Sequence, residues 1–219
     1  MKSITISKDL LEVCPCLKLG CISFSTKVVK KNDNLWSFID SYIEDEIFNK
    51  ISSDMIVKEK HIFDSREVFK RLGKDPNRHR ISTEALLRRI VKGKGLYQIN
   101  NIVDINNIIS LKTMYSVGSY DVDKLGNDVV FRIGHPGEKF KGIGKEFIDV
   151  ENTPVFADEE GAYGSPLSDS EKAMIRLEST NILTILISFS DDEIDFTDSL
   201  EIIKNYADAE NIETKVVRG

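Results

Sequence analysis

Apolar side chains recur at helical spacing through much of the first half of the chain and at alternating spacing through much of the second half. Spacings of three and four residues predict amphipathic helices over 32–51, 54–72, 82–92 and 102–114, and one more over 197–206. Helices that cluster early and strands that cluster late are typical of an α+β, or mixed α/β, fold rather than of repeated βαβ units.

Short runs rich in Val, Ile, Phe and Thr predict the strands, because β-branched and aromatic side chains fit a pleated, half-buried surface. Strands are expected at residues 4–6, 17–29, 129–133, 139–143, 147–150, 155–157, 173–177, 181–189 and 213–217. The longest apolar run, over 182–187, has the length of a strand and falls far short of the ~20 residues that cross a bilayer.

Local signals mark where several helices begin and end. Asn32 or Asp33 is expected to cap the first long helix, because a side-chain oxygen there can accept from an unpaired backbone amide. Ser7 and Ser82 are expected to cap the short helical turn near the N-terminus and the third long helix. Gly73 is expected to end the second, since glycine adopts the left-handed conformation without steric cost.

The composition is that of a globular protein with a substantial core. The chain has 219 residues, of which 41% are hydrophobic and 30% charged, and this length favours one domain over 1–219. The N-terminus lacks the basic and then apolar pattern of a signal peptide. A cytoplasmic location is therefore expected.

Charge is distributed unevenly along the chain. The net charge is −6, yet residues 58–94 hold twelve Lys or Arg against five Asp or Glu, a net of +7. Residues 185–213 hold nine acidic residues and one Lys, a net of −8. A basic patch on an acidic protein favours an anionic partner such as RNA. The alternative is a solvated helix face that an acidic helix balances elsewhere.

The three cysteines, Cys14, Cys16 and Cys21, lie close together near the N-terminus. An odd number of cysteines without a signal peptide argues against a disulfide framework. Their spacing supplies three thiolates, whereas a structural zinc site needs four ligands. Free thiols that pack in the core are therefore favoured, and neither a metal ion nor a cofactor is expected.

Several sequence stretches stand out by their order. Residues 80–95 read R-I-S-T-E-A-L-L-R-R-I-V-K-G-K-G, which combines an amphipathic helix, a cationic face and a glycine-rich exit. There follow I-N-N-I-V-D-I-N-N over 99–107, Y-D-V-D-K-L over 120–125, V-F-R-I over 130–133, P-G-E-K-F over 136–140, V-F-A-D-E-E-G over 155–161 and T-N-I-L over 180–183. Each stretch alone is a weak signal, and their shared order is a more specific one.

In this order the stretches resemble the B3/B4 module of the phenylalanyl-tRNA synthetase β subunit. Nearly the whole chain is similar to free-standing B3/B4 proteins, with the best-matching core over 80–188. The resemblance implies a single B3/B4-like domain in which helices pack on a mostly antiparallel sheet. In the synthetase this module hosts editing, the hydrolysis of tyrosine wrongly attached to the phenylalanine tRNA.

The resemblance therefore implies an RNA-binding module for tRNA or aminoacyl-tRNA, without aminoacylation activity of its own. Hydrolysis of a mischarged aminoacyl ester stays open, because the chain departs from the family at two positions. Gly118 stands where bacterial editing modules commonly have a His, and Ile185 stands where they have an acidic residue. The alternative function is a small-molecule binding protein or hydrolase, for an amino acid or dipeptide, with a remodelled pocket on the same fold.

No catalytic residue is assigned from the sequence. The candidate contacts to substrate or tRNA are Arg78, Arg80, Glu84, Arg88, Asn107, Gly118, Tyr120, Asp121, Ser165 and Ser168. For Arg80 and Arg88, salt bridges within the protein and binding of an anion are equally good interpretations. For Glu84, a favourable interaction with the helix dipole is a sufficient explanation.

Overall fold

The computed structural model describes residues 1–219. The α-helices are α1 (Lys8–Val13), α2 (Asp33–Tyr42), α3 (Lys60–Arg71), α4 (Ser82–Val91), α5 (Asn101–Thr113) and α6 (Thr197–Tyr206), with short helical turns η1 (Ile43–Phe48), η2 (Ile56–Lys58) and η3 (Val122–Lys124). The strands are β1 (Ser3–Ile6), β2 (Lys18–Ser25), β3 (Ser116–Asp121), β4 (Asp128–Ile133), β5 (Lys139–Lys141), β6 (Phe147–Asp149), β7 (Pro154–Asp158), β8 (Gly161–Gly164), β9 (Asn181–Ser188) and β10 (Glu210–Val217). None of the helices has the length and apolar content needed to cross a membrane.

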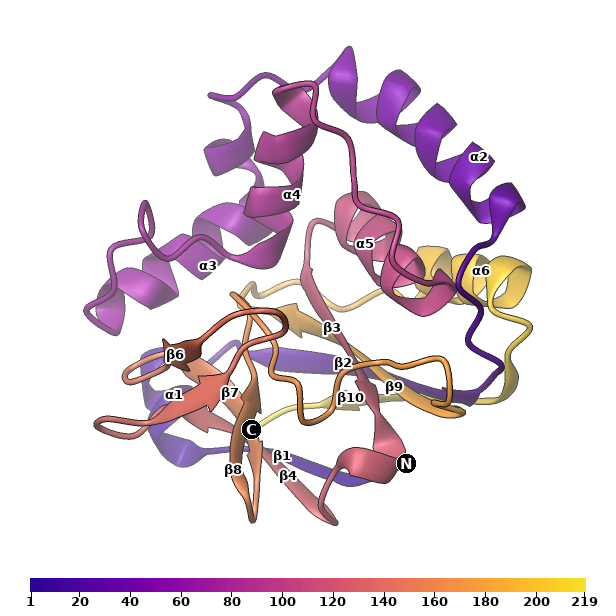
Figure 1. Cartoon of the computed structure of the whole chain (residues 1–219). Helices are drawn as coiled ribbons and strands as arrows, with labels where there is room; N and C mark the ends of the chain where they lie inside the picture. The colour runs from indigo at the N-terminus through magenta and orange to yellow at the C-terminus, as the bar shows by residue number, and fades with distance from the viewer.

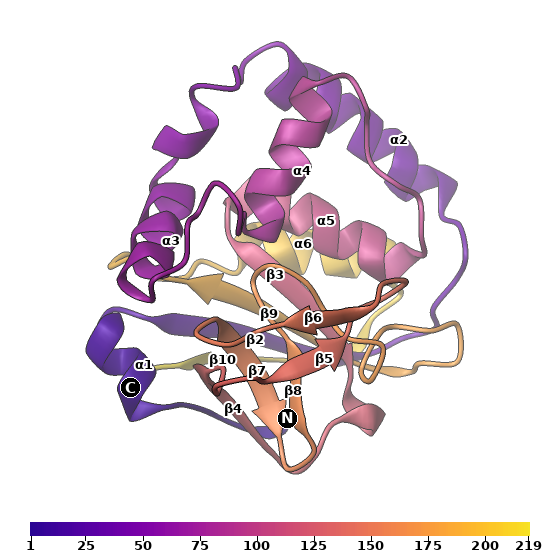
Figure 2. The same cartoon turned by 60° about the vertical axis from the view of Figure 1, so that its left-hand side comes forward.

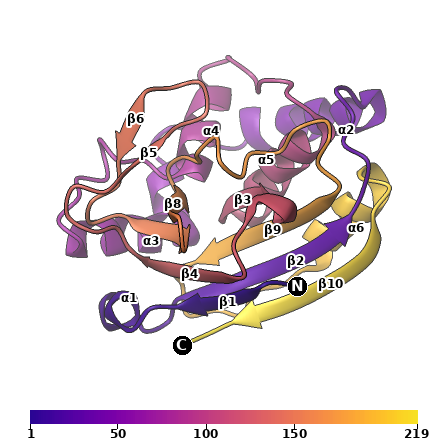
Figure 3. The ribbon, with the colours of Figure 1, turned by 60° about the horizontal axis from the view of Figure 1, so that its bottom comes forward.

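Two four-stranded sheets lie beneath a layer of helices (Figure 1). Their strand orders are β1-β4-β7-β8 and β10-β2-β9-β3, and β5 pairs with β6 in a separate hairpin. Every strand pair is antiparallel except β1 with β4. Figure 2 shows α3 and α4 above the β5–β6 hairpin, and Figure 3 shows both chain ends on the side where β1 runs beside β10. The predicted α+β fold with a mostly antiparallel sheet is confirmed.

Strand β9 shows why the layers pack as they do. Its side chains alternate between two apolar clusters, with Ile185 and its odd-numbered neighbours between the two sheets and Ile182 and Leu186 beneath the helices. A strand that is buried on both faces needs a nearly continuous apolar sequence. A third cluster, which includes Phe69 and Leu87, lies between α3, α4 and α5.

The predicted helix caps and helix ends were partly right. Asn32 caps α2, where its side-chain oxygen accepts from the amide of Leu35 at 3.0 Å. Gly73 ends α3 with φ at 76°, as predicted. The predictions for Ser7 and Ser82 were wrong, because neither hydroxyl caps a helix. The amide of Ser82 instead donates to the carbonyl of Pro166 at 2.7 Å, which satisfies it without a capping side chain.

Two predicted helices are interrupted. The helix over 32–51 changes at Ile43 from α-helix to the wider π-helix, although Ile47 stays fully buried as its spacing predicted. The helix over 54–72 divides into η2 and α3 at Glu59, whose ψ of 128° leaves the helical region. Apolar spacing therefore predicted which side chains are buried but not how far each helix continues.

Three short segments near the middle of the chain differ from expectation. Strands β3 and β8 were missed, because glycine and serine hide the alternation that marks a strand. Pairing with β9 and β7 fixes them instead. The expected strand over 173–177 is a loop, held by single contacts such as the amide of Asp121 donating to the carbonyl of Ala173 at 3.0 Å. Strand β2 ends earlier than expected, and β10 begins earlier.

Candidate nucleic-acid interface

A fully buried carboxylate organises the start of α4. Nη1 of Arg66, on α3, lies 2.9 and 3.1 Å from the two carboxylate oxygens of Glu84. Nε of Arg88, one turn further along α4, lies 2.8 Å from Oε1 of Glu84. The Glu84 side chain has no exposed surface, so its charge is balanced by these arginines and by the nearby helix N-terminus.

For Arg80 and Arg88, the structure shows the salt bridges within the protein that were one of the two interpretations. Arg88 forms the predicted salt bridge through Nε, while its two terminal nitrogens make no hydrogen bond within the protein. Arg80 is looser, because its Nε lies 3.8 Å from Oε1 of Glu84 and about half of its side chain is exposed. Glu84 thus directs both arginines along the outer side of α4 and leaves N–H groups free for an anion.

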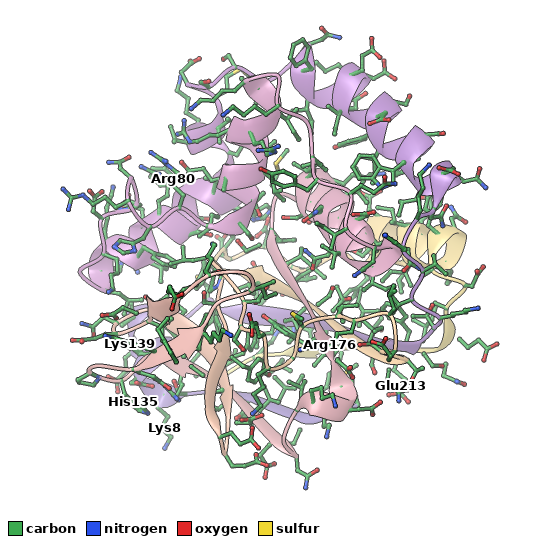
Figure 4. The ribbon with its side chains drawn as sticks, in the orientation of Figure 1. Lys8, Arg80, His135, Lys139, Arg176 and Glu213 are labelled. Carbon is green, nitrogen blue, oxygen red and sulfur yellow. The ribbon has the colours of Figure 1, made fainter.

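An open hollow of about 430 Å³ lies along this side of α4. Its lining residues share a positive charge with one exception: Arg78, Arg80, Ala85, Arg88, Arg89, Lys92 and Lys94. We call this set the α4 hollow. Figure 4 places Arg80 and Glu213, the latter at the end of the acidic stretch, in opposite corners of the view. The α4 hollow itself has no acidic lining residue, whereas Lys60, earlier in the basic stretch, pairs with Asp191 and Asp192 of the acidic stretch at 2.7 and 3.4 Å.

The sequence prediction missed three of these cations, Arg89, Lys92 and Lys94. All lie in the last turn of α4 or in the loop that follows. The four-residue spacing between Arg88 and Lys92 was the available signal, because residues four apart lie on the same helix face. The loop brings Lys94 back toward the helix, and sequence spacing alone does not show that.

The predicted position Gly118 lies beneath an aromatic ring. A Cβ atom at Gly118 would lie 2.5 Å from the hydroxyl oxygen of Tyr120, and a Cβ atom at Gly164 would lie 2.4 Å from the same oxygen. Tyr120 is almost fully buried between the two glycines. The side chain of Tyr120 therefore occupies the space that a side chain at position 118 would need.

The Tyr120 hydroxyl has a carboxylate partner that the sequence prediction also missed. It donates to Oδ1 of Asp169 at 2.8 Å. Burial raises the pKa of Asp169 from 3.8 to about 6, and the hydrogen bond from Tyr120 offsets part of that effect. The amide of Ile143 donates to the carbonyl of Asp169 at 3.2 Å, which ties this pair to the chain between β5 and β6.

We expect Asp169→Asn to flatten the dependence of stability on pH between about 4 and 6. The folded protein holds the Asp169 proton more tightly than the unfolded chain, so this group favours folding below pH ~4 and loses that contribution as pH rises through ~6. The difference is about 3 kcal/mol, since each unit of pKa shift corresponds to about 1.4 kcal/mol. Asparagine stays neutral and still accepts from Tyr120.

Urea unfolding of both proteins at several pH values measures this difference. Asp128→Asn, at an exposed position, is the matched control and should leave the pH profile unchanged. If Asp169→Asn and the original protein show the same profile, Asp169 does not hold its proton in the folded state.

The other predicted site residues have local structural partners. Asp121 caps η3 and accepts from the Ser179 hydroxyl at 2.7 Å. The Ser165 hydroxyl donates to the carbonyl of Ser168 at 2.9 Å and closes the turn. Asn107 lies in the middle of α5 and is half-buried. None of these side chains lines the α4 hollow.

Another polar cluster joins α3 to the end of β9. Nδ1 of His61 lies 3.0 Å from the hydroxyl oxygen of Ser190, and Nε2 lies 3.7 Å from Asp192. The Ser190 hydroxyl, however, donates to Asp64 at 2.7 Å. Because the hydroxyl proton of Ser190 is directed to Asp64, His61 is not placed to take that proton and activate Ser190 as a nucleophile. Burial lowers the pKa of His61, which favours its neutral form.

The three thiols are free. Cys14 and Cys21 are buried between the sheets, and burial raises the pKa of each to about 12. The half-buried Cys16 lies with its sulfur 3.6 Å from that of Cys14 and 3.2 Å from the carbonyl of Phe189. These contacts agree with thiols that pack as apolar groups.

Comparison with known proteins gives the class of this chain. A sequence profile of the B3/4 domain matches residues 64–208, which extends on both sides of the core expected from the sequence. The chain therefore belongs to the B3/4 domain family. The match also agrees with the arrangement of helices on a mostly antiparallel sheet.

Two curated relatives are phenylalanine–tRNA ligase β subunits. The one from Geobacter metallireducens is 31% identical over 102 residues, covering 45% of this chain and 13% of the relative. The one from Fusobacterium nucleatum is 26% identical over 142 residues, covering 60% of this chain and 18% of the relative. The chain thus spans less than a fifth of these relatives and is a module related to one part of that subunit.

A solved structure is also similar. It is the crystal structure of an N-terminal fragment of the phenylalanyl-tRNA synthetase β subunit from Pyrococcus horikoshii. The TM-score is 0.48 at 12% sequence identity, with 98% of this chain and 50% of the fragment covered.

Proposed function

We propose that this protein binds tRNA or aminoacyl-tRNA through the α4 hollow. The observation that carries the proposal is the lining of that hollow, with six cationic side chains and no acidic one. Such a surface attracts the phosphate backbone and releases its counterions on binding. The relatives support RNA as the anion, because their names describe a tRNA ligase.

Binding without hydrolysis is the activity that the geometry supports best. At the two positions where bacterial editing modules commonly have a His and an acidic residue, Gly118 has no side chain and Ile185 is fully buried in an apolar cluster. The space next to Gly118 is filled by Tyr120. A general acid or base must reach the reacting ester, and neither position provides one.

The test removes charge from the α4 hollow without disturbing the fold. The side chains of Arg78, Lys92 and Lys94 are exposed, and their nearest polar partner is Asp75, 3.8 Å from Nε of Arg78. We expect their joint replacement by Gln to weaken tRNA binding at least ~10-fold at low salt. The slope of log K against log salt concentration should fall by about 2, since each phosphate contact contributes ~0.7–0.9.

A charge-matched control separates this effect from net charge. Lys8, Lys30 and Lys215 are exposed lysines outside the α4 hollow, and their joint replacement by Gln should change affinity by less than ~3-fold. Equal weakening by both triple variants, or no binding by the original protein, would reject the proposed interface. A deacylation time course on the same samples, with tyrosine-charged phenylalanine tRNA, is expected to show no release above the blank.

A further inference from the structure

An exposed aromatic ring adjoins the α4 hollow. Tyr97 is 64% exposed, and the guanidinium carbon of Arg89 lies 3.8 Å from the centre of its ring. Arg89 also lines the hollow, so the ring and the cationic surface share a residue. Arg89 covers one face of the Tyr97 ring, and most of the Tyr97 side chain is exposed. The opposite face of the ring is therefore open to solvent.

The Arg89 side chain is fixed in this position by the loop after α4. Its Nε donates to the carbonyl of Gly95 at 2.7 Å, and Nη2 donates to the carbonyl of Lys94 at 3.3 Å. Gly93 and Gly95 have φ values of 72° and 59°, which let the backbone turn its carbonyls back toward the helix. Arg89 is therefore ordered before any ligand arrives.

The segment that carries Tyr97 is anchored on both sides of the ring. Leu96 packs against two apolar clusters. The amide of Ile99 donates to Asp104 at 3.0 Å, and Asp104 also accepts from the Trp36 indole at 2.7 Å. The exposure of Tyr97 is thus a feature of an ordered segment rather than of a loose one.

We infer that Tyr97 and Arg89 form a stacking platform for an unpaired base, so that the RNA bound in the α4 hollow is single-stranded where it passes Tyr97. This inference rests on the proposed function and adds the class of RNA. Paired bases hide their faces within the duplex, whereas unpaired bases stack on aromatic and guanidinium planes. The phosphates of the same strand then lie against Lys92 and Lys94.

The experiment compares a short single-stranded RNA with the blunt duplex that it forms with its complement, at one salt concentration. We expect the single strand to bind more tightly. Tyr97→Ala should weaken binding of the single strand roughly 10-fold or more and leave the duplex unchanged. Tyr97→Phe keeps the ring and should retain affinity. Phe147→Ala, at an aromatic side chain that is 68% exposed on β6, is the matched control and should have no effect.

The outcomes separate this inference from the proposed function. If Tyr97→Ala binds the single strand normally while the Arg78, Lys92 and Lys94 variant still loses affinity, the stacking platform is rejected and the interface stands. Preference of the original protein for the duplex would also reject the platform. If the charge variant binds RNA normally, the proposed function fails and the inference fails with it.

Discussion

Replacing Arg66 with Met is expected to lower the free energy of unfolding by about 4 kcal/mol. The reason is the position of Glu84, whose carboxylate has no exposed surface and receives Nη1 of Arg66 at 2.9 and 3.1 Å. Removing Arg66 leaves the buried carboxylate with Arg88 as its one hydrogen-bonded cation, and water does not reach Glu84 to make up the loss. Denaturant unfolding at neutral pH measures the loss.

A second substitution shows whether the buried charge is the cause. Glu84→Gln removes that charge, so Arg66→Met should cost much less in the Glu84→Gln background than alone. Arg71→Met is the matched control, because Arg71 is exposed and donates to one carbonyl, that of Val13. We expect the control to cost about 1 kcal/mol or less. Equal costs of Arg66→Met in both backgrounds would contradict this account.

The second large effect is expected at Gly118, where alanine should lower the free energy of unfolding by about 3 kcal/mol. Three atoms of Tyr120 lie 2.5, 2.8 and 3.0 Å from the position of the new Cβ. The ring has little freedom to move, because Gly164 lies against the same hydroxyl and Tyr163 and Phe156 pack beside it. Thermal or denaturant unfolding measures the change.

A second substitution tests whether the Tyr120 ring causes the loss of stability in Gly118→Ala. Tyr120→Leu removes all three of those atoms, so Gly118→Ala should cost far less in that background. Ser116→Ala, on the same strand, adds no atom and removes a buried hydroxyl without a partner, so its cost should be below ~1 kcal/mol. If Gly118→Ala is tolerated equally well with and without the tyrosine, the space next to Gly118 is open.

The contact between Gly118 and Tyr120 also bears on the family resemblance. A larger residue at position 118, such as the histidine of editing modules, and a tyrosine at position 120 in its present conformation compete for one space. The hydroxyl of Tyr120 is fixed by Asp169, on the loop that follows β8. Glycine at position 118 therefore leaves the space that the Tyr120 ring occupies. It also agrees with the proposal of binding without hydrolysis.

The sequence by itself determined most of the elements and the family. The continuous apolar run over 182–187 predicted β9, and Asn32 or Asp33 was expected to cap the helix that is now α2. These features depend on neighbours within a few residues, and local periodicity records which side is buried. The family resemblance, carried by ordered stretches, was confirmed by the B3/4 match over 64–208.

Only the tertiary structure decided which distant side chains meet. Tyr120 lies against Gly164 and Asp169, far along the chain, and no local spacing predicts that contact. From the sequence, an interaction with the helix dipole was enough to explain Glu84. The structure adds an ion pair with Arg66, which α3 brings against it. Periodicity shows that a side chain points inward, but its partner depends on how the layers pack. The chemistry of positions 84 and 118 was therefore fixed by packing, whereas the positive charge of the α4 hollow was already visible in residues 58–94.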